Sequence, residues 1–482
     1  MFCGISPFKR LYLYKNMAPK KDKAGYPIFS RWDGFPPFQL TKPIPTVDKA
    51  SKAFREKIRR FSNEYCGFST EVRTASDVTD YCRDSLERAK FDFKKGLYLT
   101  ESDGNAFAAV KYGSKPLEEG FRLIFSHNDS PGLGLKTKPV IVPWDPDQQE
   151  LHLGIMLDLK EVGVIQPGQW GGHDYLVKGY YYRSGKRIPL EFRGYITDVN
   201  AHTDTREVSG HTINEAYPRE GLDLVTGYRN LKDFLKAIGL KSETEFQKAN
   251  LQVYPDTPTR IFGQGFITGH AHDARIGTFS TLKAFEQTSS PYTTVLIGFD
   301  REETGSLGPG GACSTFLDDI VDEMLLKAKV VKNRKELTES FKRSIYKRSF
   351  AINSDVDVSA SDKDSDASRI DFSNISKSGY GPFLLTEDGN NTADQARRRH
   401  IDQIMDILGK ANIVFYPNGS AMTQENGQVE TCSFDINKKG LPTFAFGVPV
   451  VGTHSVSELA HEGDLYYSYL GNKTFLKADW KA

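Results

Sequence analysis

The stretch TTVLIGFDREE, residues 293–303, decides the fold that we expect for this chain. It begins with an apolar run, which is typical of a strand buried on both faces of a parallel sheet. It ends with the adjacent carboxylates of Glu302 and Glu303. Charged side chains that follow a buried strand lie at the edge of the sheet, so this stretch predicts an α/β core with polar groups at its strand ends.

Strand-like and helix-like segments alternate around this stretch. The other apolar runs are FRLIFS (121–126), SFAINSDV (349–356) and TFAFGVP (443–449), and helical patterns such as ADQARRRHIDQIMDIL (393–408) separate them. Because such alternation gives parallel strands with helices on their faces, we predict an α/β fold with a mostly parallel sheet sandwiched by helices.

The pattern changes between residues 137 and 267, where short β-type runs are broken by Gly, Pro, Asn and Asp. We expect residues 137–267 to form an inserted β-rich domain, and residues 26–136 and 268–482 to form one catalytic domain around it. A chain of 482 residues is long enough for two cores. The first 25 residues are expected to be a flexible basic tail.

Composition excludes several classes of partner. The 63 basic and 62 acidic residues nearly cancel, so no long-range field favours nucleic acid or an anionic membrane, and no apolar run is long enough to span a bilayer. The five cysteines are scattered and form no CxxC pair, which favours a reducing compartment. We therefore predict a cytoplasmic protein, with the vacuole and the mitochondrion as open alternatives.

Side chains that can bind a metal or move a proton follow the expected strands or open a neighbouring helix. They are His127, Asp129, Asp273, Glu302, Glu303, Asp355 and His454. In open α/β sheets, ligands bind outside the carboxyl ends of the strands, so these residues are expected to meet at one edge.

Histidine and carboxylate ligands without cysteine suit zinc, with cobalt or manganese as alternatives. If Asp129 and one of the two glutamates have other roles, five of the seven candidates remain as ligands. Five ligands exceed the three of a single catalytic zinc, so we predict two divalent ions that share one carboxylate. Asp129 is expected to accept a hydrogen bond from the second ring nitrogen of His127. Of the acidic pair, one carboxylate can bind a metal while its neighbour acts as general base.

Each of these signals also has a simpler interpretation. A His-x-Asp pair can be a local hydrogen bond, and an acidic pair can be solvated surface or a helix cap. The pair His270 and His272 could itself bind a metal, in a barrel of the amidohydrolase type. The shared position of the candidate residues at the strand ends is what favours the two-metal hypothesis.

Five blocks of the sequence occur in the order found in a known enzyme family. They are SHNDSPGLGLK (126–136), HDARIG (272–277), DREETGSLGPGGACSTFL (300–317), NSDVD (353–357) and VPVVGTHSVSEL (448–459). These blocks resemble the metal-site blocks of the aspartyl aminopeptidase and vacuolar aminopeptidase I family of dinuclear zinc metallopeptidases. The resemblance implies removal of an amino-terminal residue from a peptide, with a preference for Asp or Glu only slightly favoured over neutral residues.

The resemblance also assigns roles to the candidate residues. It implies that His127 and Glu303 bind one metal, that Asp355 and His454 bind the other, and that Asp273 bridges them. Glu302 would be the general base and Asp129 the partner of His127.

The family further implies that the insert dimerises and that dimers build a large homo-oligomer, possibly a dodecamer. The segment ITDVNAHTDT (196–205) resembles the one that sends a histidine, here His202, into a neighbouring active site to bind substrate. Ala274 stands where the family usually has Asp or Asn, and NGSAMTQENGQVETCSF (418–434) replaces a glycine-rich block. These departures keep open the alternative of a catalytically silent relative that serves assembly or cargo binding.

Overall fold

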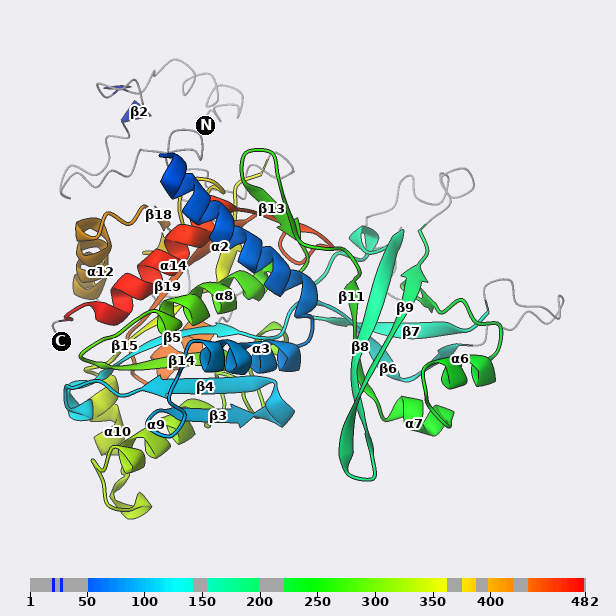
Figure 1. The fold of residues 1–482 in the computed structure, drawn as a ribbon, viewed down its shortest axis with the longest axis horizontal. Helices are drawn as coiled ribbons and strands as arrows, with labels where there is room; N and C mark the ends of the chain where they lie inside the picture. Colours follow the sequence, from blue (N-terminus) through cyan, green and yellow to red (C-terminus); the bar gives the residue numbers. More distant parts are fainter. Residues whose placement is uncertain are drawn as a thin grey trace, which may run out of the picture.

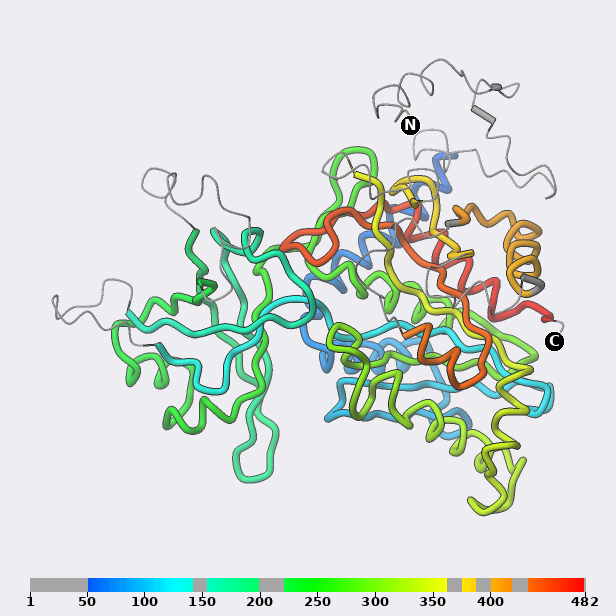
Figure 2. Tube along the Cα trace, turned by 180° about the vertical axis from the view of Figure 1, so that it is seen from behind, coloured from blue at the N-terminus to red at the C-terminus, as the bar shows by residue number. Residues whose placement is uncertain are grey.

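The computed structural model describes residues 51–141, 154–198, 221–361, 375–386, 398–418 and 432–480, together with the short strands β1 (Lys20–Lys21) and β2 (Pro27–Ile28). Two units lie side by side, a sheet covered by helices and a smaller barrel (Figure 1). The trace in Figure 2 shows that the larger unit contains chain from before and after the barrel. Apart from β1, the expected basic tail lies outside the described residues.

The larger unit is built on a nine-stranded sheet. Its four central strands, β19, β15, β5 and β14, lie in that order and are parallel. The flanking strands β4 and β17 are antiparallel to them, and β3 pairs with β4 at one edge. The expected α/β fold with a largely parallel sheet is therefore confirmed. The strands are β3 (Leu97–Glu101), β4 (Ala106–Lys111), β5 (Phe121–His127), β14 (Thr293–Phe299), β15 (Phe350–Asn353), β16 (Val356–Val358), β17 (Phe383–Leu385), β18 (Tyr416–Asn418) and β19 (Thr443–Val450).

Side chains of the central strands alternate between two cores, one on each face of the sheet. On β5, Ile124 packs into the first core, while Leu123 and Phe125 pack into the second. The first core lies under α2 (Lys52–Glu71), α3 (Ala75–Arg88), α8 (His272–Glu286), α12 (Arg398–Lys410) and α14 (Glu462–Lys477). The second core lies under α9 (Phe316–Lys327), α10 (Glu339–Tyr346) and α13 (Cys432–Lys438).

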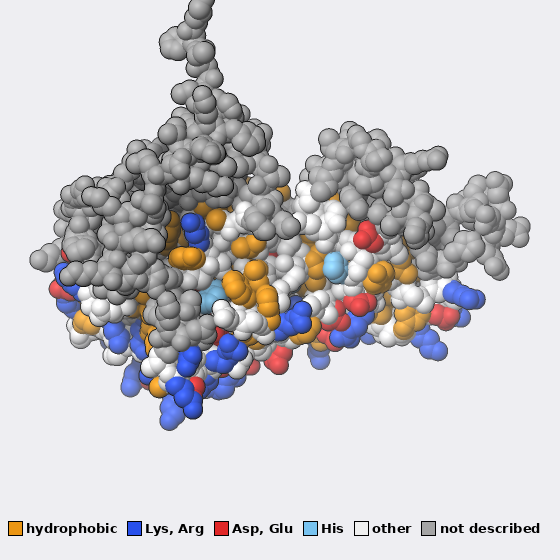
Figure 3. All heavy atoms as spheres, turned by 90° about the horizontal axis from the view of Figure 1, so that it is seen from above, with side chains coloured by type: hydrophobic (Ala, Val, Ile, Leu, Met, Phe, Trp, Pro, Cys, Tyr) orange, Lys and Arg blue, Asp and Glu red, His pale blue; other side chains and the backbone are white. Residues whose placement is uncertain are grey.

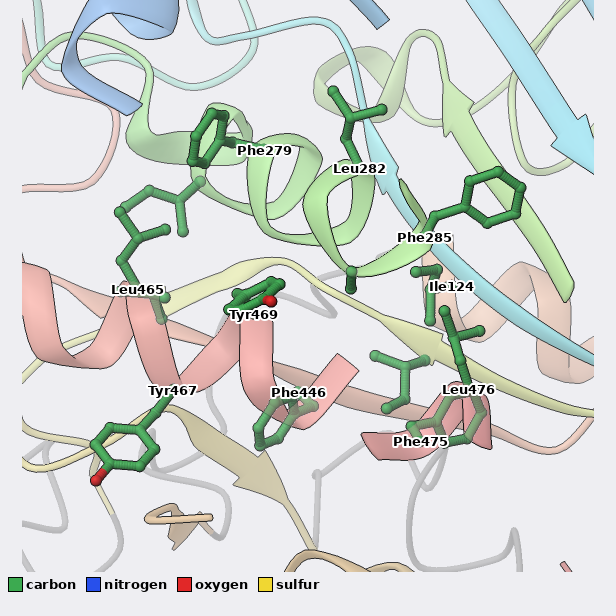
Figure 4. Close-up of a cluster of buried hydrophobic side chains, with 14 of the residues drawn as sticks. Ile124, Phe279, Leu282, Phe285, Phe446, Leu465, Tyr467, Tyr469, Phe475 and Leu476 are labelled. Carbon is green, nitrogen blue, oxygen red and sulfur yellow. The ribbon is translucent and has the colours of Figure 1, made fainter. Parts of the chain in front are cut away.

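Helices α8 and α14 pack against each other and against the sheet in the first core. Figure 4 shows Phe279 and Phe285 of α8 among Leu465 and Phe475 of α14. Gly277 of α8 lies so close to the sheet that an added Cβ would be 1.8 Å from the carbonyl oxygen of Ser354. This close packing fixes the first turn of α8 at the carboxyl ends of the strands.

The smaller unit is a closed barrel in the order β10-β7-β6-β11-β8-β9. Its strands run from Gly132 to Pro255, whereas the hairpin β12–β13 (Arg260–Phe262, Phe266–Gly269) pairs with β20 (Glu458–His461) of the larger unit. The barrel limits thus differ from the expected boundaries at 137 and 267. Its strands are β6 (Gly132–Ile141), β7 (Met156–Val162), β8 (His173–Arg183), β9 (Lys186–Ile196), β10 (Leu224–Val225) and β11 (Asn250–Pro255).

The surface agrees with the balanced composition. On the face in Figure 3, both basic and acidic side chains occur on the described part of the molecule. Among the helices that the structure describes, none is long and apolar enough to cross a membrane.

Candidate metal centre

The carboxyl ends of the central strands bring the candidate residues together. In parallel register, the last residue of β14, Phe299, pairs with the last residue of β5, His127. Glu302 and Glu303 lie in the 3-10 turn η5 (Glu302–Thr304) that follows β14. The others sit just after β5 (Asp129), β15 (Asp355) and β19 (His454), or in the first turn of α8 (Asp273).

His127 lies at the centre of this group and is 1 % exposed. Its Nε2 is 3.0 Å from Oδ1 of Asp273 and 3.4 Å from Oδ1 of Asp355, and its Nδ1 is 3.3 Å from Oδ1 of Asp129. Burial opposes a charge on the ring, but these carboxylates together raise the pKa of His127 well above its usual value. A proton on Nδ1, shared with Asp129, leaves Nε2 free to bind a metal.

His454 contacts the other oxygen of Asp273. Its Nε2 is 3.3 Å from Oδ2 of Asp273 and 3.7 Å from Oε2 of Glu303. Its Nδ1 is 2.6 Å from the carbonyl oxygen of Val164, and because a carbonyl only accepts, the Nδ1 proton must point there. Burial works against a charge on this ring, yet Asp273 raises the pKa of His454 to about 9.

Asp273 connects the two histidines. Its Oδ1 faces His127 and its Oδ2 faces His454, the arrangement that a carboxylate shared by two metals requires. Burial opposes ionisation, but hydrogen bonds and charge from the two imidazoles lower the pKa of Asp273. The residue therefore carries its negative charge between two potential metal positions.

The two adjacent glutamates lie beside these groups; both residues are partly buried, and the side chain of Glu303 is only 3 % exposed. Burial, reinforced by Asp355 and Asp273, raises the pKa of Glu302 to about 8, and burial likewise raises that of Glu303 well above its usual value. Oε1 of Glu303 is fully buried and has no hydrogen-bond partner among the described residues. An orphaned carboxylate oxygen among imidazoles and other carboxylates fits a divalent cation, which would supply the missing partner.

Asp129 accepts two hydrogen bonds that the sequence does not predict. Besides its contact with His127, its Oδ1 accepts the backbone N–H of Glu302 and its Oδ2 accepts that of Glu303, both at 3.1 Å. One carboxylate thus holds the acidic turn and a histidine in a fixed relation.

Glu458 is a site residue that sequence reasoning missed. It is fully buried; its Oε1 accepts the backbone N–H of His454 at 2.8 Å, and its Oε2 accepts that of Asp273 at 3.1 Å. Burial raises the pKa of Glu458 to about 8. The available signal was its place four residues after His454, within the block VPVVGTHSVSEL.

The contacts also allow a pairing of ligands with metals other than the expected one. The expected combination of His127, Asp273 and Glu303 does offer three ligand atoms within 4.8 Å of one another. However, the direct contacts join His127 to Asp355 and His454 to Glu303, with Asp273 touching both histidines. Side-chain direction, which the chain order does not reveal, accounts for the difference.

The geometry contradicts the amidohydrolase alternative. Nδ1 of His272 accepts from the hydroxyl of Tyr65 at 2.6 Å and its Nε2 donates to the carbonyl of Ile267 at 3.2 Å, so neither nitrogen is free for a metal. The ring of His270 stands perpendicular to that of Trp170, 5.7 Å away, and burial lowers the pKa of His270 to about 3. In the described ranges neither histidine belongs to a metal-binding cluster.

Two other expectations fall outside the described residues. They are His202, expected at a neighbouring active site, and most of the segment that replaces the glycine-rich block, residues 419–431.

Comparison with known proteins gives a consistent result. The sequence model of the family described as "Aminopeptidase I zinc metalloprotease (M18)" matches residues 196–476. The probable M18 family aminopeptidase 1 of Borreliella afzelii is 25 % identical over 464 residues, covering 89 % of this chain and 98 % of the relative, and that of Thermotoga neapolitana is 24 % identical, covering 88 % and 97 %.

Solved structures share the fold. The M18 family aminopeptidase from Thermotoga maritima superposes with a TM-score of 0.77 at 21 % identity, covering 90 % of this chain and 98 % of that one. The S. cerevisiae mApe1 dodecamer gives a TM-score of 0.67 at 13 % identity, covering 87 % and 97 %.

Proposed function

Because this chain belongs to the M18 family of aminopeptidase I zinc metalloproteases, we propose that it removes the amino-terminal residue from peptides at the centre described above, with two divalent ions, most simply zinc, bound per chain. The observation that carries the proposal is the position of Asp273, whose two oxygens face one histidine each.

The proposed ligands follow the shortest contacts. His127 and Asp355 hold one ion, Glu303 and His454 hold the other, and Asp273 contacts both. Two such ions would supply Lewis acidity and lower the pKa of a water molecule between them. The orphaned Oε1 of Glu303 supports its role as a ligand.

Glu302 is proposed as the general base. Its backbone is held by Asp129, next to the ligand Glu303, so its carboxylate can take a proton from the attacking water and return it to the leaving amine. Asp129 is a positioning residue in this proposal, because it orients the ring of His127 and the turn that carries both glutamates.

Substrate preference, assembly and location are finer parts of the proposal. We propose peptides with acidic amino-terminal residues, to be tested against a panel of aminoacyl chromogenic substrates, where faster turnover of leucyl than of aspartyl or glutamyl substrates would reverse the assignment. A homo-oligomer, with His202 entering a neighbouring site, is supported by the dodecameric mApe1 structure, and light scattering that shows only monomers would exclude it. The scattered cysteines support a cytoplasmic location.

The acidic pair provides the test of mechanism. Glu302→Gln should retain both metals and slow turnover by roughly 10²- to 10⁴-fold, the usual contribution of a general base. Glu303→Gln should instead lose metal on dialysis and regain part of its activity in excess zinc, cobalt or manganese. If Glu302→Gln is the variant that sheds metal, the roles are wrongly assigned. Well under two metals per wild-type chain would favour the catalytically silent alternative.

A further inference from the structure

The barrel reaches into the metal centre through one short loop. Residues 163–165 follow β7, and the carbonyl of Val164 accepts the Nδ1 proton of His454 at 2.6 Å. Next to it, Gly163 lies against Glu303: a Cβ at position 163 would be 2.7 Å from Oε2 and 3.3 Å from Cβ of that glutamate. The loop therefore touches two residues that the proposed function assigns to the same metal.

Backbone atoms make these contacts. The side chain of Val164 is 76 % exposed, so its carbonyl is the group that faces the site. Gly163 has φ +72°, a conformation that glycine adopts without strain and other residues rarely adopt. Glycine thus serves twice at this position, since it permits the turn and leaves room for the Glu303 carboxylate.

The loop and the His454 segment are anchored in the barrel core. Ile165 is buried there, and so is Val456, two residues after His454. Among the described residues, the other buried members of this core all come from residues 133–253. Val456 therefore ties the segment that carries His454 to the barrel.

A histidine that binds a metal through one nitrogen is oriented by the partner of the other, and loss of such a partner typically costs about 10- to 100-fold in metal affinity. Here that partner belongs to the barrel, whereas Asp129, the partner of His127, belongs to the sheet unit. The second ring nitrogens of the two proposed histidine ligands thus find their partners in different parts of the molecule.

We propose that the loop 163–165 is a positioning element for the Glu303–His454 metal position, so that the barrel contributes to the affinity of one of the two metals and not of the other. This inference rests on the proposed function.

The test compares two glycine substitutions in the full-length protein. Gly163→Ala adds a methyl group against Glu303. Gly185→Ala, in the β8–β9 turn, is the matched control, because Gly185 has φ +74° and nothing within 4 Å of an added Cβ. Metal-free protein is titrated with zinc against a chromogenic chelator, and the visible spectrum of the cobalt form reports coordination.

We expect Gly163→Ala to bind one metal about 10- to 100-fold more weakly and to change the cobalt spectrum, while the other metal and both metals of Gly185→Ala keep wild-type affinity. The inference is overturned if Gly163→Ala binds both metals as wild type does, if both positions weaken equally, or if the control weakens to the same extent. A wild-type protein that binds fewer than two metals would instead overturn the proposed function.

A second variant covers the case in which Gly163→Ala does not fold. Val456→Ala shortens the side chain that ties the His454 segment to the barrel core. Weaker binding of one metal supports the inference, and unchanged binding of both overturns it.

Discussion

Replacing Asp129 by asparagine should disturb the whole centre without removing a proposed metal ligand. The carboxylate accepts three hydrogen bonds, from the backbone N–H groups of Glu302 and Glu303 and from the ring of His127. Asparagine keeps one oxygen and replaces the other by an NH₂ group, which cannot accept. In either orientation, at least one N–H group therefore loses its acceptor and faces a donor.

The magnitude follows from that count. A hydrogen bond to a charged group contributes about 1.5–3 kcal/mol. Since about 1.4 kcal/mol corresponds to a factor of ten, the loss of one bond should lower metal affinity or turnover by roughly 10- to 150-fold. The lower limit applies if the backbone N–H groups of Glu302 and Glu303 both stay close to the amide oxygen of the new asparagine. The upper limit applies if the turn that carries these two glutamates moves.

The assay is chelator competition for metal affinity, together with kcat and KM at saturating zinc. Asp300→Asn is the matched control, because Asp300 is also buried and follows the same strand as the acidic turn, but its hydrogen bonds come from the side chains of Ser102 and Asn105. Wild-type metal affinity and kcat in Asp129→Asn, or an equal loss in the control, would show that Asp129 does not organise the centre.

Three further predictions concern the hydrogen bonds of Glu458, the packing of Gly277, and the protonation of Glu302 and His454. Glu458→Gln replaces one of the two carboxylate oxygens that accept the backbone N–H groups of Asp273 and His454, so metal affinity should fall about tenfold in the same chelator assay. Unchanged affinity would show that Glu458 does not position these two residues. Gly277→Ala would place a methyl group 1.8 Å from the carbonyl of Ser354, so urea unfolding should show a loss of about 1–3 kcal/mol or more, and wild-type stability would contradict this packing. In the folded, metal-free protein the pKa of Glu302 is raised from 4.5 to about 8 and that of His454 from 6.5 to about 9. Between these values the folded state binds more protons than the unfolded state. The unfolding free energy should therefore fall as pH rises from 6.5 towards 8, and bound zinc should reduce this slope; a rise over this range would contradict the assignment.

The sheet was predictable because its strands are continuous apolar runs. TTVLIGF and FRLIFS are mainly apolar, as expected of strands buried on both faces, and they form the adjacent strands β14 and β5. The limits of the barrel were less predictable. Its first strand begins at Gly132, inside a block of alternating Gly and Leu that the sequence pattern assigns to the catalytic domain.

The membership of the candidate site follows from topology, since parallel strands place their carboxyl ends at one edge. The contacts within it depend on side-chain direction, which sequence does not specify. Glu458 was missed because its partners are backbone N–H groups, present at every residue except proline. The contact of Val164 with His454 joins residues 290 positions apart and involves a carbonyl, so no residue type signals it.

The interruption of the sheet unit by the barrel also bears on when the protein becomes active during its synthesis. His127 and Asp273 lie 146 residues apart, and His454 follows much later, so a nascent chain carries an incomplete set of ligands for most of its translation. At about 5–20 residues per second, roughly a quarter of a minute to a minute separates His127 from His454 on the ribosome. The barrel strands, complete at Pro255, can close during this interval, before His454 is made. The order of the chain thus places His454, the last of the proposed ligands, after the barrel whose Val164 carbonyl contacts it.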